Sequence, residues 1–184
     1  MSSRFGIYYA RRTNIEPDWN FLNRFALGQT LDAPFGSFVC FKYEPGSPPF
    51  PVAQKYFGLA SSRAIGETLY IGVQANVGFF HYEHCQEGAL LRRLAYNYDG
   101  GWILVEGCPQ DWEREILFVE EKLQTTLACF EEDMHDHIRG IWERKQLQPG
   151  DQFPGVDPDA LYGELQRYYQ LPSIADYLKL HGEQ

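Results

Sequence analysis

The chain has 184 residues, of which 44% are hydrophobic and 22% charged, a composition typical of a folded domain with a substantial core. Its formal net charge of -9 disfavours nucleic acid and anionic membrane surfaces as partners, because binding to both depends on lysine and arginine. No apolar run approaches the roughly 18 residues that a membrane span needs. The N-terminus also lacks a secretory-signal pattern, so we expect a cytoplasmic protein.

The N-terminal third predicts a β-α-β arrangement. The apolar run from Phe5 to Ala10 is typical of a strand. A helix is expected from about Pro17 to Gly28, because proline favours the first turn of a helix and glycine its C-terminal cap. Residues 37–43 predict a second strand, and the proline-rich residues 44–51 predict an extended loop.

Four short apolar segments predict an antiparallel meander, at residues 68–74, 77–84, 89–96 and 101–106. Turn signals separate the segments, and evenly spaced strands joined by tight turns favour antiparallel pairing over βαβ units. The last turn contains Asp99-Gly100, a strong hairpin signal because type I′ turns need positive φ at their central residues.

The periodicity changes after residue 109. Apolar residues recur every three or four positions from Trp112 to Ile141, which predicts one long amphipathic helix or two helices in line. Residues Ile116 to Val119 could instead form a fifth strand of the meander.

The C-terminal part begins with a connector rich in proline and glycine at residues 148–157. Asp157-Pro158 then predicts a helix start, with an acidic N-cap and proline at the first position, and a short terminal helix is expected over residues 174–180. We therefore expect one α+β domain over residues 1–184. Residues 1–146 supply a mainly antiparallel sheet and the long helix, and residues 147–184 dock further helices on that sheet.

Two clusters carry side chains that could bind a metal ion. In the meander, strand alternation places His81 on one face and His84 on the other. On the predicted long helix, Asp133 and His137 are i,i+4 neighbours, and His135 stands between them. Such pairs can chelate a divalent ion if a third ligand arrives from elsewhere, and they equally fit a solvated helix face. The two clusters would form one site only if they met in space.

Two functions are compatible with the sequence. The first is a non-catalytic interaction or regulatory module, with a protein partner or self-association, since the chain has 16% aromatic residues and no nucleotide, nucleophile-elbow or zinc-protease motif. The alternative is a metal-dependent or small-ligand-binding enzyme that uses some of His81, His84, Asp133, His135 and His137. Two cysteines are further candidates as a nucleophile: Cys85, next to His84, and Cys108, at a predicted helix start where the helix dipole would favour the thiolate. No cofactor is predicted, and we expect the face that carries His81 to lie beneath the long helix.

Overall fold

The computed structural model describes residues 4–12, 38–42, 58–64 and 66–171, and the fold is of the α+β class, as predicted. Six strands form one sheet in the order β2-β1-β3-β4-β5-β6, with every neighbouring pair antiparallel. The strands are β1 (Arg4–Arg12), β2 (Phe38–Lys42), β3 (Gly66–Gln74), β4 (Phe79–Gln86), β5 (Ala89–Asn97) and β6 (Gly101–Gly107). The helix expected near residues 17–28, the loop at 44–51 and the helix at 174–180 lie outside the described residues.

Strands β3 to β6 form the predicted meander, in which consecutive strands pair as hairpins. Between β4 and β5 the turn residues Glu87 and Gly88 have φ of 50° and 80°, as a type I′ turn requires. The hairpin predicted at Asp99-Gly100 is confirmed by the pairing of β5 with β6, but its turn is not of type I′, because the positive φ, 66°, is at Gly101 instead. Glycine is needed there, since a Cβ atom would lie 2.2 Å from the Asp151 carbonyl oxygen.

The connector at residues 148–157 runs along the free edge of β6. The Trp102 amide donates to the Asp151 carbonyl oxygen at 2.8 Å, and the Gly150 amide donates to the Trp102 carbonyl oxygen at 2.9 Å. The Trp102 indole donates to the Pro154 carbonyl oxygen at 2.9 Å. The connector therefore occupies backbone groups that a further strand would otherwise pair with.

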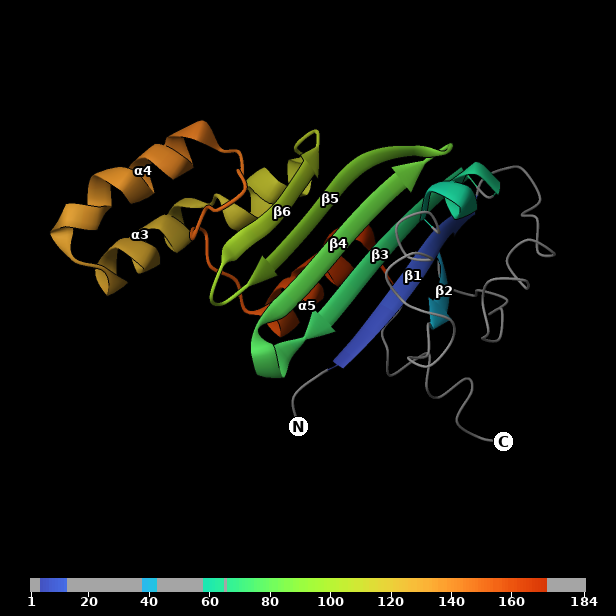
Figure 1. Cartoon of the computed structure of the whole chain (residues 1–184), viewed down its shortest axis with the longest axis horizontal. Helices are drawn as coiled ribbons and strands as arrows, with labels where there is room; N and C mark the ends of the chain where they lie inside the picture. Colours follow the sequence, from blue (N-terminus) through green and yellow to red (C-terminus); the bar gives the residue numbers. More distant parts are fainter. Residues whose placement is uncertain (1–3, 13–37, 43–57, 65, 172–184) are drawn as a thin grey trace.

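The prediction of one long helix, or of two helices in line, is wrong. The segment instead forms a π-helical turn η2 (Glu113–Leu117), helix α3 (Glu120–Cys129), a 3₁₀ turn η3 (Glu132–Met134) and helix α4 (His135–Arg144). The alternative strand at Ile116 to Val119 is also not formed. Helices α3 and α4 lie side by side beyond the β6 edge of the sheet (Figure 1).

Burial explains why the helix breaks. A continuous helix from Trp112 to Ile141 would be about 45 Å long and would hold its last turns far from its first. The chain turns at Phe130, whose backbone is extended, so that α4 returns along α3. Trp142 then becomes buried, with its ring 5.8 Å from that of Phe118 and its indole donating to the Val119 carbonyl oxygen at 3.2 Å.

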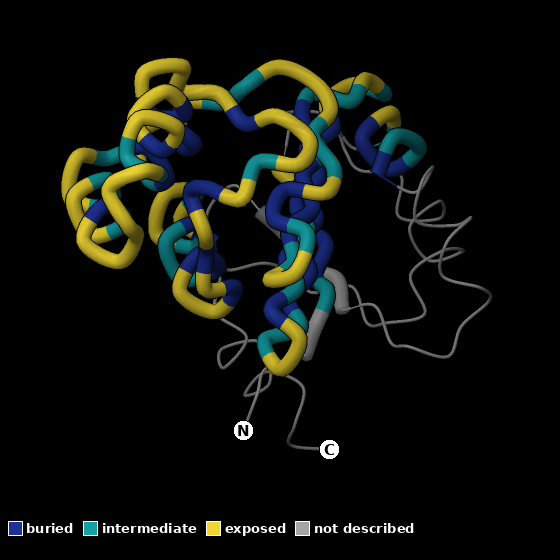
Figure 2. The backbone as a smooth tube through the Cα atoms, turned by 60° about the vertical axis from the view of Figure 1, so that its left-hand side comes forward, coloured by how far each residue is buried: buried dark blue, intermediate teal, exposed yellow. Residues whose placement is uncertain are grey.

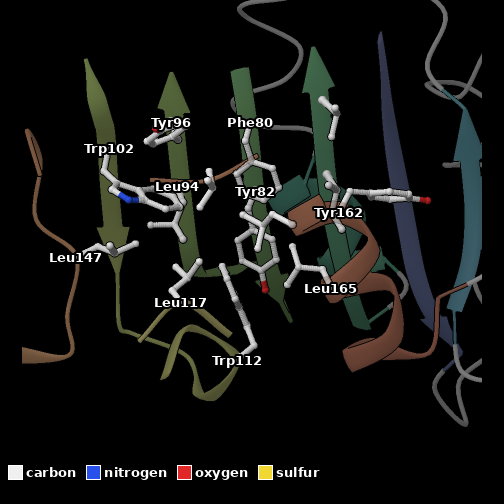
Figure 3. Close-up of a cluster of buried hydrophobic side chains, with 14 of the residues drawn as sticks. Phe80, Tyr82, Leu94, Tyr96, Trp102, Trp112, Leu117, Leu147, Tyr162 and Leu165 are labelled. Carbon is white, nitrogen blue, oxygen red and sulfur yellow. The ribbon is translucent and has the colours of Figure 1, made fainter. Parts of the chain in front are cut away.

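Helix α5 (Pro158–Tyr169) covers one face of the sheet, which we call the inner face. The Asp157 carboxylate caps the helix by accepting from the amides of Asp159 and Ala160, as its sequence predicts. Figure 3 shows Leu165 and Tyr162 of α5 against side chains of the sheet. Buried residues follow the strands, and exposed ones dominate the outer turns of the chain (Figure 2).

The opposite face of the sheet, the outer face, carries Glu83 and Cys85 beside the helical residues 58–64. The Thr68 hydroxyl donates to the Gly58 carbonyl oxygen at 3.1 Å, which ties this helical turn to β3. Within the described ranges, no helix combines the length and the apolar character that crossing a membrane would require.

A buried ion pair fixes η2 to the sheet. The Arg92 guanidinium on β5 donates to both carboxylate oxygens of Glu113, at 2.9 and 2.6 Å, and to the Gly107 carbonyl oxygen at 2.8 Å. Both side chains are only 1% exposed. An uncompensated charge in such a place is costly, whereas an apolar pair of similar volume is not.

We expect Glu113→Leu to lower the free energy of unfolding by about 3–5 kcal/mol, because it leaves the Arg92 charge buried and unpaired. The double variant Arg92→Met/Glu113→Leu should recover most of this loss, and urea denaturation measures both. Asp136→Asn, which removes the exposed pair with Arg139, is the control and should change stability within experimental error. A double variant no more stable than the single one would contradict the prediction.

Candidate functional site

A group of polar side chains fills one end of the inner face, where β3 begins, β4 ends and α5 ends. We call it the Gln110 cluster, and its members are Glu67, Tyr82, His84, Gln110, Trp112 and Tyr169. His84 pairs with Leu69 in the sheet register, so Glu67, two residues before Leu69, is its diagonal neighbour on the same face. The Glu67 Oε1 and His84 Nε2 atoms are 2.9 Å apart.

The indole of Trp112 fixes the orientation of the Gln110 amide. Trp112 Nε1 lies 3.2 Å from Gln110 Oε1, and an indole nitrogen can only donate, so the amide oxygen must point towards it. The hydroxyl groups of Tyr82 and Tyr169 donate to the same oxygen at 2.5 and 3.1 Å. The amide nitrogen of Gln110 consequently faces His84 Nδ1, at 2.6 Å.

This orientation determines the protonation of His84. An amide nitrogen donates and does not accept, so His84 Nδ1 must be the acceptor and carries no proton. The ring proton is then on Nε2, which donates to the Glu67 carboxylate. His84 is a neutral imidazole with both nitrogens bonded, and it presents no lone pair to a metal ion or a substrate.

Charge and burial set the protonation of the other members of the cluster. Burial alone would raise the pKa of Glu67, but the hydrogen bond from His84 and the charge of Arg11, whose Nη1 lies 3.0 Å from Glu67 Oε2, outweigh it and hold that pKa below its usual value. Burial also raises the pKa of Tyr82 and of Tyr169, so both phenols stay protonated and donate. The backbone amide of Gln110 donates to Glu113 at 2.8 Å, which fixes the residue at both ends.

His81 lies on the outer face, opposite to His84, as strand alternation predicted. Its ring contacts those of Tyr70 and Phe79, at centroid distances of 5.2 and 6.4 Å. Burial, with the nearby Arg93 charge, lowers the pKa of His81 to about 4. The expectation that the long helix covers the face with His81 is wrong, because η2 packs on the inner face, where Trp112 contacts Tyr82.

The second predicted cluster does not reach the first. His135 Nε2 bonds the carbonyl oxygens of Leu127 and Phe130, at 2.9 and 3.0 Å, and so caps the end of α3. Asp133 and His137 are exposed, and α4 lies beyond the β6 edge, away from β4 (Figure 1). Across residues 4–12, 38–42, 58–64 and 66–171, no group of three or more His, Cys, Asp or Glu side chains could hold a metal ion.

The Cys85 thiol is buried on the outer face and lies 3.6 Å from Glu83 Oε1. Burial, together with the Glu83 carboxylate, raises the pKa of Cys85 well above its usual value. A thiol held in this form is a poor nucleophile.

A cleft of about 520 Å³ opens between the η2–α3 segment and α5. Apolar side chains that include Ile116, Val156 and Leu161 form its lining together with polar ones. Its charged lining residues are the carboxylates Glu115, Glu121, Asp157 and Glu164, with the single ammonium group of Lys122. Lys122 Nζ bonds both carboxylate oxygens of Glu164, at 3.0 and 3.3 Å, and so joins α3 to α5.

The sequence predicts neither the Gln110 cluster nor the cleft. Gln110 stands in a turn between elements, where no periodic pattern marks it. The acidic residues of the cleft come from the η2–α3 segment and from α5, and the sequence does not reveal that these two segments pack together. Acidic residues in a first helical turn are also expected on any helix, because they interact favourably with the helix dipole. The only sequence signal for the cleft is the number of acidic residues on the η2–α3 segment and on α5.

Neither a protein-family model, nor a curated protein, nor a solved structure matches this chain. Functional inference therefore rests on the geometry of the chain itself.

We expect Gln110→Leu to lower the free energy of unfolding by about 2 kcal/mol or more, because it leaves His84 Nδ1 and the Trp112 indole buried without their partner. Gln148→Leu, at an exposed glutamine, is the matched control and should leave stability unchanged. Urea denaturation gives both values. Equal stabilities of the two variants would show that the cluster does not stabilise the fold.

His81 should make stability depend on pH. Its folded pKa of about 4 is below the 6.5 of an ordinary histidine, so the unfolded chain binds a proton that the folded chain does not. Stability should therefore fall as the pH falls from about 6.5 to about 4, by at most about 3 kcal/mol from this residue. His81→Leu should flatten that slope in urea titrations, and the exposed-site variant His137→Leu should not. Parallel slopes in the two variants would contradict the assignment.

Proposed function

We propose that the protein is a non-catalytic interaction module that binds a partner protein in the cleft between α3 and α5. The observation that carries the proposal is the cleft itself, which is open, has an apolar component and lies on exposed helices. Apolar surface that is rimmed by polar side chains is typical of binding sites for other proteins or ligands.

The bonding of the reactive side chains supports a binding role rather than a catalytic one. Both ring nitrogens of His84 and the carboxylate of Glu113 are used in the fold. His135 caps a helix, and Cys85 is held as a thiol. A general base needs a free lone pair within reach of its substrate, and in His84 that lone pair is occupied by Gln110.

The alternative is a metal-dependent enzyme that uses histidines of β4 and α4, and it has less support. Its candidate ligands are divided between the two faces of β4 and a distant helix. A stoichiometric metal in the purified protein, with a rise in melting temperature on adding Zn²⁺ or Mn²⁺, would favour the enzyme over the module. We expect neither.

The proposal is tested by filling the cleft. Ala160 is an exposed residue of α5 that lines the cleft, and Ala128 is an exposed residue of α3 that does not. The wild type, Ala160→Trp and Ala128→Trp are immobilised and exposed to a native extract of the source cells. We expect one protein to be retained in stoichiometric amount by the wild type and by Ala128→Trp, and to be lost with Ala160→Trp.

Melting temperatures of the two tryptophan variants serve as the check on folding, and both should match the wild type. Retention of the same proteins by all three baits would refute a partner site in this cleft.

A further inference from the structure

The cleft has two walls of different origin. One wall comes from η2 and the start of α3, with Ile116 and Val119, and the other from the connector and the start of α5, with Val156 and Leu161. The Lys122–Glu164 pair spans the two walls. A volume of about 520 Å³ suits one or two long side chains rather than a whole helix.

The charged groups that line the cleft are predominantly negative. Four carboxylates line it against one ammonium group, and that group is already bonded to Glu164. Asp157 accepts from two amides of α5 through its Oδ1 atom. Glu115 and Glu121 are exposed, one on each side of the link between η2 and α3, and no lysine or arginine other than Lys122 lines the cleft among the described residues.

The same negative field extends past the cleft along η2. Tyr168, near the end of α5, is 38% exposed, and the Glu115 and Asp111 carboxylates are close enough to add to the effect of burial and raise its pKa. An exposed aromatic ring beside carboxylates is a suitable surface for a cationic head group, through the attraction between the cation and the ring.

An occupant must match apolar walls and an anionic rim at once. Lysine and arginine side chains do so, because a chain of methylene groups carries the charged end. The formal net charge of -9 would in addition steer a basic partner towards the protein and repel anionic ones.

We infer that the cleft binds a lysine- or arginine-bearing segment of the partner protein, with the aliphatic stems on the half-buried Ile116 and Val119 and the cationic ends at Glu115 and Glu121. This inference rests on the proposed function and names the chemistry of the partner. Binding should weaken as salt rises, since the contacts at the rim are exposed to solvent.

The test uses the full chain and a fluorescein-labelled peptide of alternating lysine and alanine. Fluorescence anisotropy measures its affinity for the wild type, for Glu115→Gln/Glu121→Gln, and for Glu132→Gln/Glu143→Gln. The last variant loses the same charge from exposed acids that do not line the cleft. We expect the cleft variant to bind about tenfold more weakly than the wild type and the control variant to bind almost as well as the wild type.

Three outcomes would overturn the inference. Equal losses in the two variants would mean attraction by overall charge alone. Equal binding of a matched glutamate–alanine peptide would exclude charge as the basis of recognition. Binding of spermine without binding of the peptide would identify a free polyamine as the ligand.

The partner captured from cell extract separates this inference from the proposed function. Loss of that partner with both Ala160→Trp and Glu115→Gln/Glu121→Gln supports both proposals. If Ala160→Trp releases it and the glutamine variant retains it, the cleft is a partner site that does not recognise basic side chains. If both variants retain it, the proposed function fails as well.

Discussion

The side-chain amide of Gln110 is the contact through which the sheet and its helical layer are held in register. It receives hydrogen bonds from β4, from the segment that opens η2 and from the last turn of α5, and it donates to His84. One residue therefore contacts groups from three parts of the chain that are far apart in sequence. Because this half-buried amide satisfies both of its ends within the fold, displacement of any one of these elements breaks at least one of its hydrogen bonds.

The polar side chains of the molecule fall into two populations with different roles. Inside, every charge or amide of the Gln110 cluster and of the Arg92–Glu113 pair is matched to a partner, which makes these groups part of the scaffold. Outside, the carboxylates of η2, α3 and α5 outnumber the bases that line the cleft with them. Apart from the capping role of Asp157 and the Lys122–Glu164 pair, these carboxylates surround an apolar hollow at the surface, an arrangement that is complementary to a basic partner.

Local chemistry made part of the fold predictable and left the rest undetermined. The meander and the start of α5 follow from strand alternation, turn residues and the Asp157 cap, all of which act over a few neighbouring residues. The turn at Phe130 does not, since the apolar stripe continues through it and the chain folds back there because of packing between α3 and α4. The candidate site was likewise predictable only in part. That His81 and His84 occupy opposite faces was predictable from the strand, whereas the bond from Gln110 that occupies His84 depends on packing across 26 positions.

The pairing of the connector with Trp102 has a consequence for how the protein behaves in a crowded solution. An uncovered edge strand is a template on which other chains can add strands, and native proteins block such edges with loops or charges. Here the outward N–H and C=O groups of Trp102 are both taken by residues 150 and 151. Cleavage of the chain between α4 and α5 would therefore do more than release a helix, because it would expose this template and favour intermolecular sheets. The connector therefore protects the β6 edge from intermolecular pairing, in addition to linking α4 to α5.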